Sequence, residues 1–143
     1  MTSLAVFEEL EPPTQPARRR ILDDIFVSRR LRLLLAVHGG RPVGYALYYF
    51  TYSSFLAKPT LYLEDLFVDA EQRGLGVGGA LLARCAKEAV AAGCGRMEWS
   101  VLNWNTKAAR FYEELGARRL SDWSVYRMDS AAISELARRP SGP

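Results

Sequence analysis

Residues 61–92 read LYLEDLFVDAEQRGLGVGGALLARCAKEAVAA. The first eight of them are rich in aromatic and branched apolar side chains, a composition that predicts a β-strand. A polar turn follows, and four glycines then fall within residues 74–79. Apolar residues next recur at helical spacing as far as Gly93, where a helix is expected to end. The stretch therefore predicts a strand, a glycine-rich turn and a helix in succession.

This succession is typical of sites that bind phosphate groups. The first amides of a helix have no partner within the helix, and the aligned peptide dipoles add positive potential there. Glycines let a pyrophosphate come close to the backbone, and Arg73 adds a positive charge where the turn begins. A glycine-rich connection without a ligand is the alternative. The arginine, together with Glu64 and Asp65 on the preceding strand, favours a ligand site.

The glycines also match the G-x-G-x-x-G fingerprint of dinucleotide-binding domains, at Gly74, Gly76 and Gly79. In that fingerprint the first glycine follows the strand directly, whereas residues 69–73 intervene here. The chain also lacks the repeated β-α-β units of such domains, and no Lys-Ser/Thr pair follows the glycines as in a P-loop. A nucleotide-dependent enzyme is thus an alternative that only the glycine pattern favours.

Residues 73–78, RGLGVG, resemble the acetyl-CoA-binding motif of the GNAT superfamily of N-acetyltransferases, Gln/Arg-x-x-Gly-x-Gly/Ala. Further segments resemble its diamine acetyltransferase subfamily, which includes the spermidine/spermine and thialysine N-acetyltransferases. These segments are YYFTYSS at 48–54, LYLED at 61–65, NWN at 103–105 and FY at 111–112. The resemblance extends over nearly the whole chain.

The resemblance implies one N-acetyltransferase domain over residues 1–143, of the α/β (α+β) class. Its mixed, mostly antiparallel sheet should be splayed at the central strand and flanked by helices. The implied enzyme transfers an acetyl group from acetyl-CoA to a primary amine of a diamine, a polyamine or a thialysine-like amino acid, by direct attack without a covalent enzyme intermediate. A catalytically silent CoA-binding module is one alternative. An acetyltransferase for another amine, such as a peptide N-terminus or an aminoglycoside, is the other.

The same resemblance implies roles for individual residues. Tyr112 matches the general acid, and a phenol with a pKa of about 10 can protonate the thiolate of a thiol with a pKa of about 8.5. Glu64 is expected to accept the proton of the substrate ammonium, since partial burial would raise its pKa toward neutrality. The expected cofactor-binding residues are Leu66, Phe67, Val68, Arg73, Gly74, Leu75, Gly76, Val77, Gly78, Gly79, Asn105, Ala108 and Tyr112. Those expected to bind substrate are Glu8, Tyr52, Ser53, Glu64 and Asp65.

The substrate residues carry two further expectations. Side chains alternate along a strand, so Glu64 and Asp65 can share one face only if a β-bulge intervenes; two structural hydrogen-bond acceptors are the alternative. Asp65 is expected to attract the cationic substrate. Polyamine-acetylating members have an aspartate soon after the tyrosine at Tyr52, where this chain has Ser53 and Ser54. In this respect the chain resembles the thialysine type.

The N-terminal segment, residues 1–16, departs from the family pattern. Residues 4–8 resemble the end of the family's first helix, so the usual first strand is expected to be missing, which would leave an edge that a homodimer could cover. Glu8 matches a carboxylate that reaches the substrate amine; a solvated charge at a helix end is the alternative. Helices are also expected at 17–26, 106–115 and 131–139, strands at 31–37, 43–51, 96–102, 117–120 and 123–128, and a tail at 140–143.

The composition sets limits on the remaining classes. The chain has 143 residues, enough for one domain with a core, and a net charge of +3 that does not argue for nucleic acid. No apolar run is long enough to span a membrane and no signal peptide is visible, which predicts a cytoplasmic protein. Cys85 and Cys94 are isolated and His38 is the single histidine, so no disulfide scaffold and no metal site are expected.

Overall fold

The computed structural model describes residues 2–9 and 11–139. The chain divides into two compact units, Met1–Asn103 and Trp104–Pro143, and each is described by itself. The single-domain organisation therefore stays a prediction, and the predicted tail at 140–143 lies outside the described residues.

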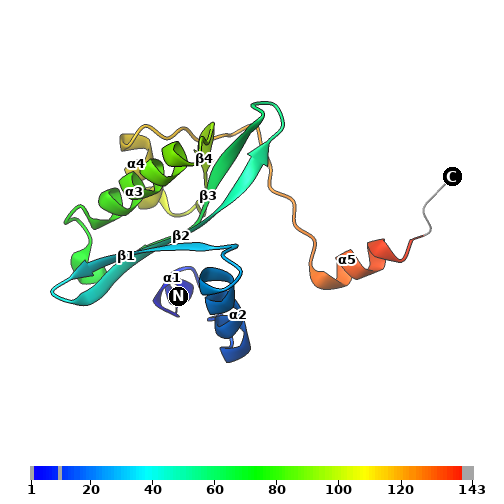
Figure 1. Ribbon diagram of the computed structural model, residues 1–143, viewed down its shortest axis with the longest axis horizontal. Coiled ribbons are helices and arrows are strands. Elements are labelled where there is room, and N and C mark those ends of the chain that lie inside the picture. Colours follow the sequence, from blue (N-terminus) through cyan, green and yellow to red (C-terminus); the bar gives the residue numbers. More distant parts are fainter. Residues whose placement is uncertain (1, 10, 140–143) are drawn as a thin grey trace. The chain divides into compact units, whose positions relative to one another are not determined.

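The first unit contains the sheet and most of the helices (Figure 1). Its elements, in chain order, are α1 (Thr2–Phe7), α2 (Gln15–Phe26), β1 (Arg32–His38), β2 (Arg41–Ser53), β3 (Lys58–Val68), the short 3-10 helix η1 (Ala70–Gln72), α3 (Val77–Ala91) and β4 (Arg96–Glu98). The predicted strand, turn and helix of residues 61–92 are thus β3, the loop with η1, and α3.

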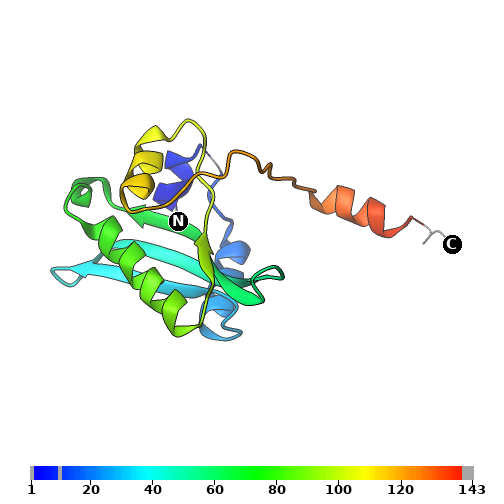
Figure 2. The same cartoon turned by 90° about the horizontal axis from the view of Figure 1, so that it is seen from above.

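Four strands form one sheet in the order β1-β2-β3-β4. The pairs β1–β2 and β2–β3 are antiparallel, whereas β3–β4 is parallel, so the mixed, mostly antiparallel sheet is confirmed. Helix α3 lies on one face of the sheet, and α1 and α2 lie on the other (Figures 1 and 2). The core lies beneath α3. Its buried residues include Ala46, Tyr48, Leu61, Leu63, Leu81, Leu82, Cys85 and Ala89.

A β-bulge interrupts the pairing of β2 with β3. Leu47 is opposite Asp65, and the next residue of β2, Tyr48, is opposite Leu63, so Glu64 has no partner in the register. One extra residue in a strand shifts the alternation of its side chains by one. Glu64 and Asp65 therefore share the face opposite α3, while Leu63 stays in the core. The bulge that would let the two adjacent carboxylates share one face is thus present.

The sheet is splayed beside β3, as the family resemblance implied. Strand β4 pairs with β3 only from Thr60 to Tyr62, opposite Arg96 to Glu98. Beyond this point, within the described residues, β3 pairs with β2 alone. The edge of residues 63–68 is open on that side. The predicted strand at 96–102 is correspondingly shorter than expected, because the backbone leaves the sheet after Glu98.

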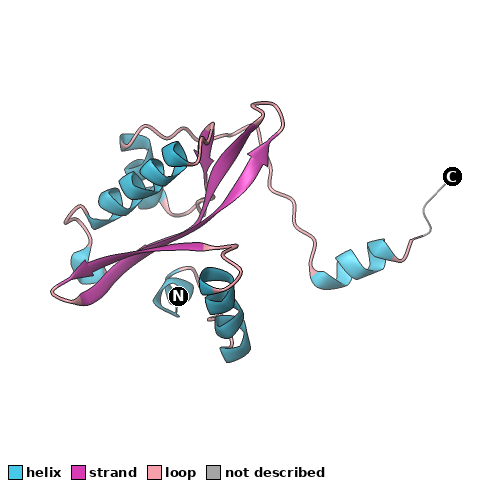
Figure 3. Ribbon diagram, viewed as in Figure 1, coloured by secondary structure: helices cyan, strands magenta, loops and turns pink. Residues whose placement is uncertain are grey.

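The second unit contains α4 (Thr106–Glu114) and α5 (Ser130–Ala137). The strands predicted at 117–120 and 123–128 are wrong: the segment between the two helices is irregular (Figure 3). Trp123, Val125 and Tyr126 are 78%, 84% and 93% exposed. The two strands were expected to form a hairpin, but their apolar side chains have no face to cover in this unit, and a two-stranded hairpin alone is marginally stable.

Candidate active site

The sheet face opposite α3 brings carboxylates and tyrosines together. The bulge places Glu64 and Asp65 on this face, and alternation along β2 places Tyr45 and Tyr49 there too, one on each side of Leu47. Tyr45 interacts with Asp65, and Tyr49 interacts with Glu64. The two carboxylates of the bulge thus each face one phenol of the neighbouring strand.

Aromatic pairs border the two carboxylates along the sheet. The rings of Tyr45 and Phe67 have centroids 5.8 Å apart, and those of Tyr49 and Tyr62 are 5.3 Å apart. These pairs are direct cross-strand neighbours in the register of β2 and β3. Aromatic faces next to carboxylates attract a cation and exclude water from it. The face is therefore suited to an organic ammonium group.

Asp65 is the desolvated carboxyl of the site. Its burial, and then the negative charges of Glu64 and Glu8, raise its pKa from 3.8 to about 6, while Tyr45 acts in the opposite direction. Glu8, which directly follows α1, acts on both Asp65 and Tyr45, so the structure brings a third predicted substrate residue to this site. Partial burial was expected for Glu64, but its side chain is exposed. Glu64 is exposed because it is the extra residue of the bulge, and no residue of β2 lies opposite it to cover its side chain.

Tyr45 and Tyr49 were not among the predicted site residues. Burial, followed by the charges of Asp65 and Glu8, raises the pKa of Tyr45 well above its usual value. Burial, followed by the charge of Glu64, raises the pKa of Tyr49. The positions of Tyr45 and Tyr49 follow from the alternation of side chains along β2 once the bulge in β3 is known. Pairing β2 with β3 so that Glu64 and Asp65 share one face would therefore have found both tyrosines.

Tyr52 and Ser53 lie at the far end of β2, opposite Pro59 and Lys58. Ser53 is 4% exposed, and its Oγ accepts a hydrogen bond from the Leu56 amide at 3.3 Å, so its hydroxyl holds the turn. Tyr52 is 67% exposed. The register separates both residues from the bulge, and the structure does not bring them together with Glu64 and Asp65. Their contact with substrate stays a prediction.

The glycine-rich turn has the backbone that a phosphate site needs. Gly74 and Gly76 have φ values of 80° and 82°, in the left-handed region that favours glycine. Gly76 is the N-cap residue of α3 and has no side chain to bond the first helical amides. The first hydrogen bond of the helix runs from the Ala80 amide to the Gly76 carbonyl at 2.9 Å. A Cβ built at Gly74, Gly76 or Gly79 would meet nothing within 4 Å. The amides at this helix start are thus open to an anion.

Arg73 ties the turn to the end of β3. Its Nε donates a hydrogen bond to the Val68 carbonyl at 2.9 Å, and its guanidinium lies 5.2 Å and 5.9 Å from the ring centroids of Phe7 and Phe67. Its charge lies at the start of the turn, as expected. The side chain itself has a structural role there that the sequence did not predict.

The predicted residues of the second unit lie on α4. The Oδ1 of Asn105 accepts a hydrogen bond from the Ala108 amide at 3.1 Å, so Asn105 is the N-cap of α4. Tyr112 lies one turn beyond Ala108, and its ring is 5.1 Å from that of Phe111. Both Ala108 and Tyr112 are partly buried. Their contact with a cofactor stays a prediction.

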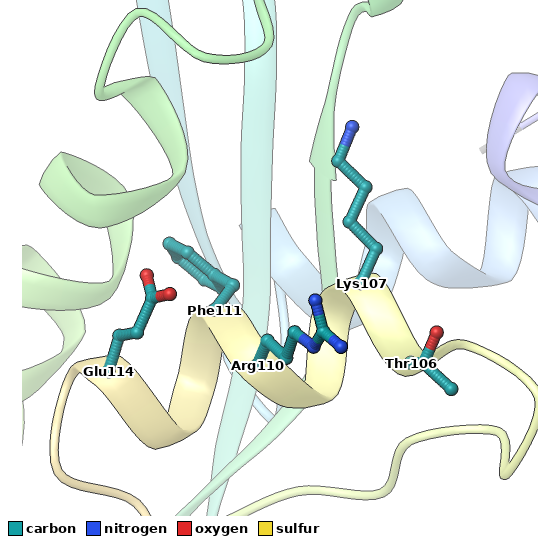
Figure 4. A pocket seen from close by; sticks show the side chains of 5 residues that line it. All are labelled: Thr106, Lys107, Arg110, Phe111 and Glu114. Carbon is teal, nitrogen blue, oxygen red and sulfur yellow. The ribbon is translucent and has the colours of Figure 1, made fainter.

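A pocket lies along α4, but it is not lined by these residues. Its lining consists of Thr106, Lys107, Arg110, Phe111 and Glu114, whose side chains extend from successive turns of the helix (Figure 4). Lys107 and Arg110 give it a basic character. None of the residues predicted to act on substrate or cofactor takes part in it.

Three other features of the described residues concern metal ligands, the buried thiol and helix length. Within it, no group of three or more His, Cys, Asp or Glu side chains is placed to hold a metal ion. Burial raises the pKa of the Cys85 thiol to about 11, which makes it a poor nucleophile. Among residues 2–9 and 11–139, none of the helices has the length and apolar character that crossing a bilayer requires.

The chain is similar in sequence to known acetyltransferases. The chain is 41% identical over 102 residues to thialysine N-epsilon-acetyltransferase of Sus scrofa, across 69% of this chain and 59% of that protein. It is 41% identical over 93 residues to L-ornithine N5-acetyltransferase NATA1 of Arabidopsis thaliana, across 65% of this chain and 41% of that protein. The chain thus spans about three fifths and two fifths of the lengths of these relatives.

A solved structure and a family model complete the comparison. The crystal structure of a Trypanosoma brucei acetyltransferase superposes with a TM-score of 0.67 at 25% identity, across 88% of this chain and 87% of that one. The model of the acetyltransferase (GNAT) family matches residues 2–117. This match includes the bulged strand, the glycine-rich turn and α4. The chain belongs to the GNAT family of acetyltransferases.

Proposed function

We propose that this chain is an acetyl-CoA-dependent N-acetyltransferase that acetylates a primary amine of a small cationic substrate. The observation that carries the proposal is the β-bulge at Glu64. It presents Glu64 and Asp65, together with Glu8, on one sheet face, beside the open edge of β3 that leads to the glycine-rich turn. An acidic, aromatic face suits an ammonium group, and the open helix start suits the phosphates of an acyl donor.

The residues present fit acetyl-CoA. The amides that begin α3, with Gly74, Gly76 and Gly79 open to solvent, would hold the pyrophosphate. The open edge of residues 66–68 would pair with the amide groups of the pantetheine arm, although the Val68 carbonyl is already occupied by Arg73. When bound, acetyl-CoA supplies an acetyl group activated as a thioester. Family membership and this fit support its use.

The proton transfers are assigned to Glu64 and Tyr112. Glu64 accepts a proton from the substrate ammonium, directly or through water, which leaves a neutral amine able to attack the acetyl carbon. Tyr112 donates its phenol proton to the departing sulfur. Asp65 holds a cationic group of the substrate. Its pKa of about 6 also makes it the second candidate for the proton acceptor, because it is largely charged at neutral pH.

A basic amino acid with a side-chain amine is the proposed substrate class. The names of the two relatives point to thialysine and ornithine, which are both small amino acids of this kind. Where polyamine-acetylating enzymes carry an aspartate, this chain has Ser53 and Ser54, so it has one carboxylate fewer for a long polycation. Polyamines are therefore the second candidate.

The assembly and the location are further parts of the proposal. We propose a homodimer because members of this subfamily usually pair, and because β1 is an edge strand whose backbone can be covered by a partner. The two small substrates, acetyl-CoA and a free amine, favour a cytoplasmic location.

The experiment is a measurement of free thiol released from acetyl-CoA with thialysine, ornithine, lysine, spermidine and an aminoglycoside. Wild type is expected to turn over thialysine or ornithine fastest. Tyr112→Phe and Glu64→Gln are each expected to lower kcat by about a hundredfold or more at pH 7. Asp65→Asn should instead raise KM for the amine. The roles of Glu64 and Asp65 are exchanged if Asp65→Asn lowers kcat and Glu64→Gln raises only KM.

A further inference from the structure

Each carboxylate of the bulge faces its own tyrosine of β2. Tyr45 and Tyr49 are four residues apart, and Leu47, midway between them, is opposite Asp65. The shift in register lies immediately after Leu47, so Tyr45 is on the Asp65 side of the bulge and Tyr49 on the Glu64 side. The electrostatic interactions follow this division, with Asp65 acting on Tyr45 and Glu64 acting on Tyr49.

The hydroxyl of Tyr45 is buried without a hydrogen-bond partner among the described residues. Its ring is held against Phe67, with 5.8 Å between centroids. A buried hydroxyl that donates to nothing is costly, so it is expected to donate a hydrogen bond to an acceptor within reach. The charged acceptor that acts on it most strongly is Asp65.

We propose that Tyr45 is a positioning residue of the amine site: its hydroxyl turns onto the Asp65 carboxylate, orients it, and keeps it negatively charged for the second cationic group of the substrate. The inference rests on the proposed function for the identity of the substrate. The link between Tyr45 and Asp65 stands on the register, the bulge and the buried hydroxyl.

Charge balance at Asp65 explains why such a donor is needed. Among the described residues, the titratable groups that act on Asp65 are Glu64, Glu8 and Tyr45. Burial and the two glutamates raise the pKa of Asp65, and the tyrosine lowers it. Tyr45 is thus the group of these three that favours the charged carboxylate. Without its hydroxyl the pKa of Asp65 would rise above about 6.

The test is the pH dependence of KM for the amine in Tyr45→Phe. A hydrogen bond to a charged acceptor favours the charged form by on the order of tenfold to a hundredfold. If the loss in Tyr45→Phe lies midway in this range, about a tenth of the Asp65 side chains would be charged at pH 6.5 in the variant. In wild type the charged fraction at pH 6.5 is about three quarters. We therefore expect KM to rise about eightfold at pH 6.5 and to come within about twofold of wild type at pH 8.5, with kcat little changed.

Tyr49→Phe is the matched control, because it removes one phenol from the same face of the same strand. It should leave the pH dependence of KM as in wild type, since Tyr49 faces Glu64. In an Asp65→Asn background, Tyr45→Phe should have no further effect on KM, because a positioning residue acts only through its partner.

Direct titration of Asp65 separates this inference from the proposed function. The carboxyl carbon of Asp65, followed by NMR in wild type and Tyr45→Phe, reports its pKa whether or not the protein turns over any amine. A higher pKa in Tyr45→Phe supports the inference, and an unchanged pKa or an unchanged KM profile overturns it. Wild type that acetylates no amine would instead overturn the proposed function while leaving the titration valid.

Discussion

Deletion of Glu64 should remove the bulge and leave the rest of β3 in place. The partners on either side, Leu47–Asp65 and Tyr48–Leu63, are already consecutive in β2, so the shortened strand can pair regularly along its whole length. Alternation then keeps Leu63 on the α3 face and Asp65 on the opposite face. Glu64→Gln is the companion variant, because it keeps the bulge and removes only the charge.

The two variants should separate binding from chemistry. Glu64→Gln is expected to bind acetyl-CoA as wild type does and to lower kcat by about a hundredfold to ten-thousandfold, the usual contribution of a general base. Deletion of Glu64 should lower kcat as much and should also weaken acetyl-CoA binding by about tenfold or more. The reason is that the bulge bends β3. Without the bulge, the open edge of β3 beside it would straighten.

Stability should barely change on deletion of Glu64, since the side chain is exposed and no core residue changes face. A change within about 1 kcal/mol corresponds to less than about 4 °C in Tm for a chain of this size. Deletion of Leu66 is the control. It keeps the bulge but moves Phe67 and Val68 to the wrong faces, so that variant should unfold at a much lower temperature.

The assay combines thermal unfolding by circular dichroism, calorimetric titration with acetyl-CoA, and thiol release with the best amine. The reasoning about the bulge is refuted if the protein lacking Glu64 binds acetyl-CoA as tightly as wild type. The assignment of Glu64 is refuted if Glu64→Gln keeps the wild-type kcat at pH 7.

Two further predictions concern Asp65 and Gly79. Because the folded-state pKa of Asp65 is raised from 3.8 to about 6, its contribution to stability is present below about pH 4 and is lost as pH rises through about 6. Asp65→Asn should therefore be more stable than wild type at pH 7, by about 1–2 kcal/mol after allowance for partial exposure. At pH 3.5 the two proteins should show no difference of this origin. Urea unfolding at both pH values measures the free energies. An equal difference at both pH values would contradict this origin. Gly79→Ala should stabilise α3 by about 0.5–1 kcal/mol, since the added Cβ meets nothing within 4 Å. The same variant should raise KM for acetyl-CoA, because that Cβ would lie where the phosphates approach. An unchanged KM would place the phosphates elsewhere.

The sequence predicted the first unit well, because local signals and long-range packing agree there. The glycines and the apolar periodicity marked the turn and α3. Glu64 and Asp65 could share one face only through a bulge, and the register contains that bulge. The exposure of Glu64 and the burial of Asp65 could not be predicted. They depend on which of the two residues lacks a cross-strand partner, which only the register defines.

The second unit shows where pattern reasoning fails. Asn105 and Asp129 are short-range caps, whose hydrogen bonds lie within three residues, and local sequence is enough to find such caps. Residues 117–120 and 123–128 were predicted to be strands, but a strand needs backbone partners that a local stretch of sequence does not provide. The role of Tyr45 was missed for a related reason, since its significance depends on what lies across the sheet.

If this chain transfers acetyl groups to a side-chain amine, the product will carry the acetyl group at that nitrogen. Wild-type protein should be incubated with acetyl-CoA and thialysine at pH 7.5, and the product examined by tandem mass spectrometry. We expect an acetyl group on the side-chain nitrogen, formed at a rate that falls by about a hundredfold or more in Glu64→Gln. Bound acetyl-CoA with no acetylated amine from thialysine or ornithine would contradict it and would identify the chain as a CoA-binding module.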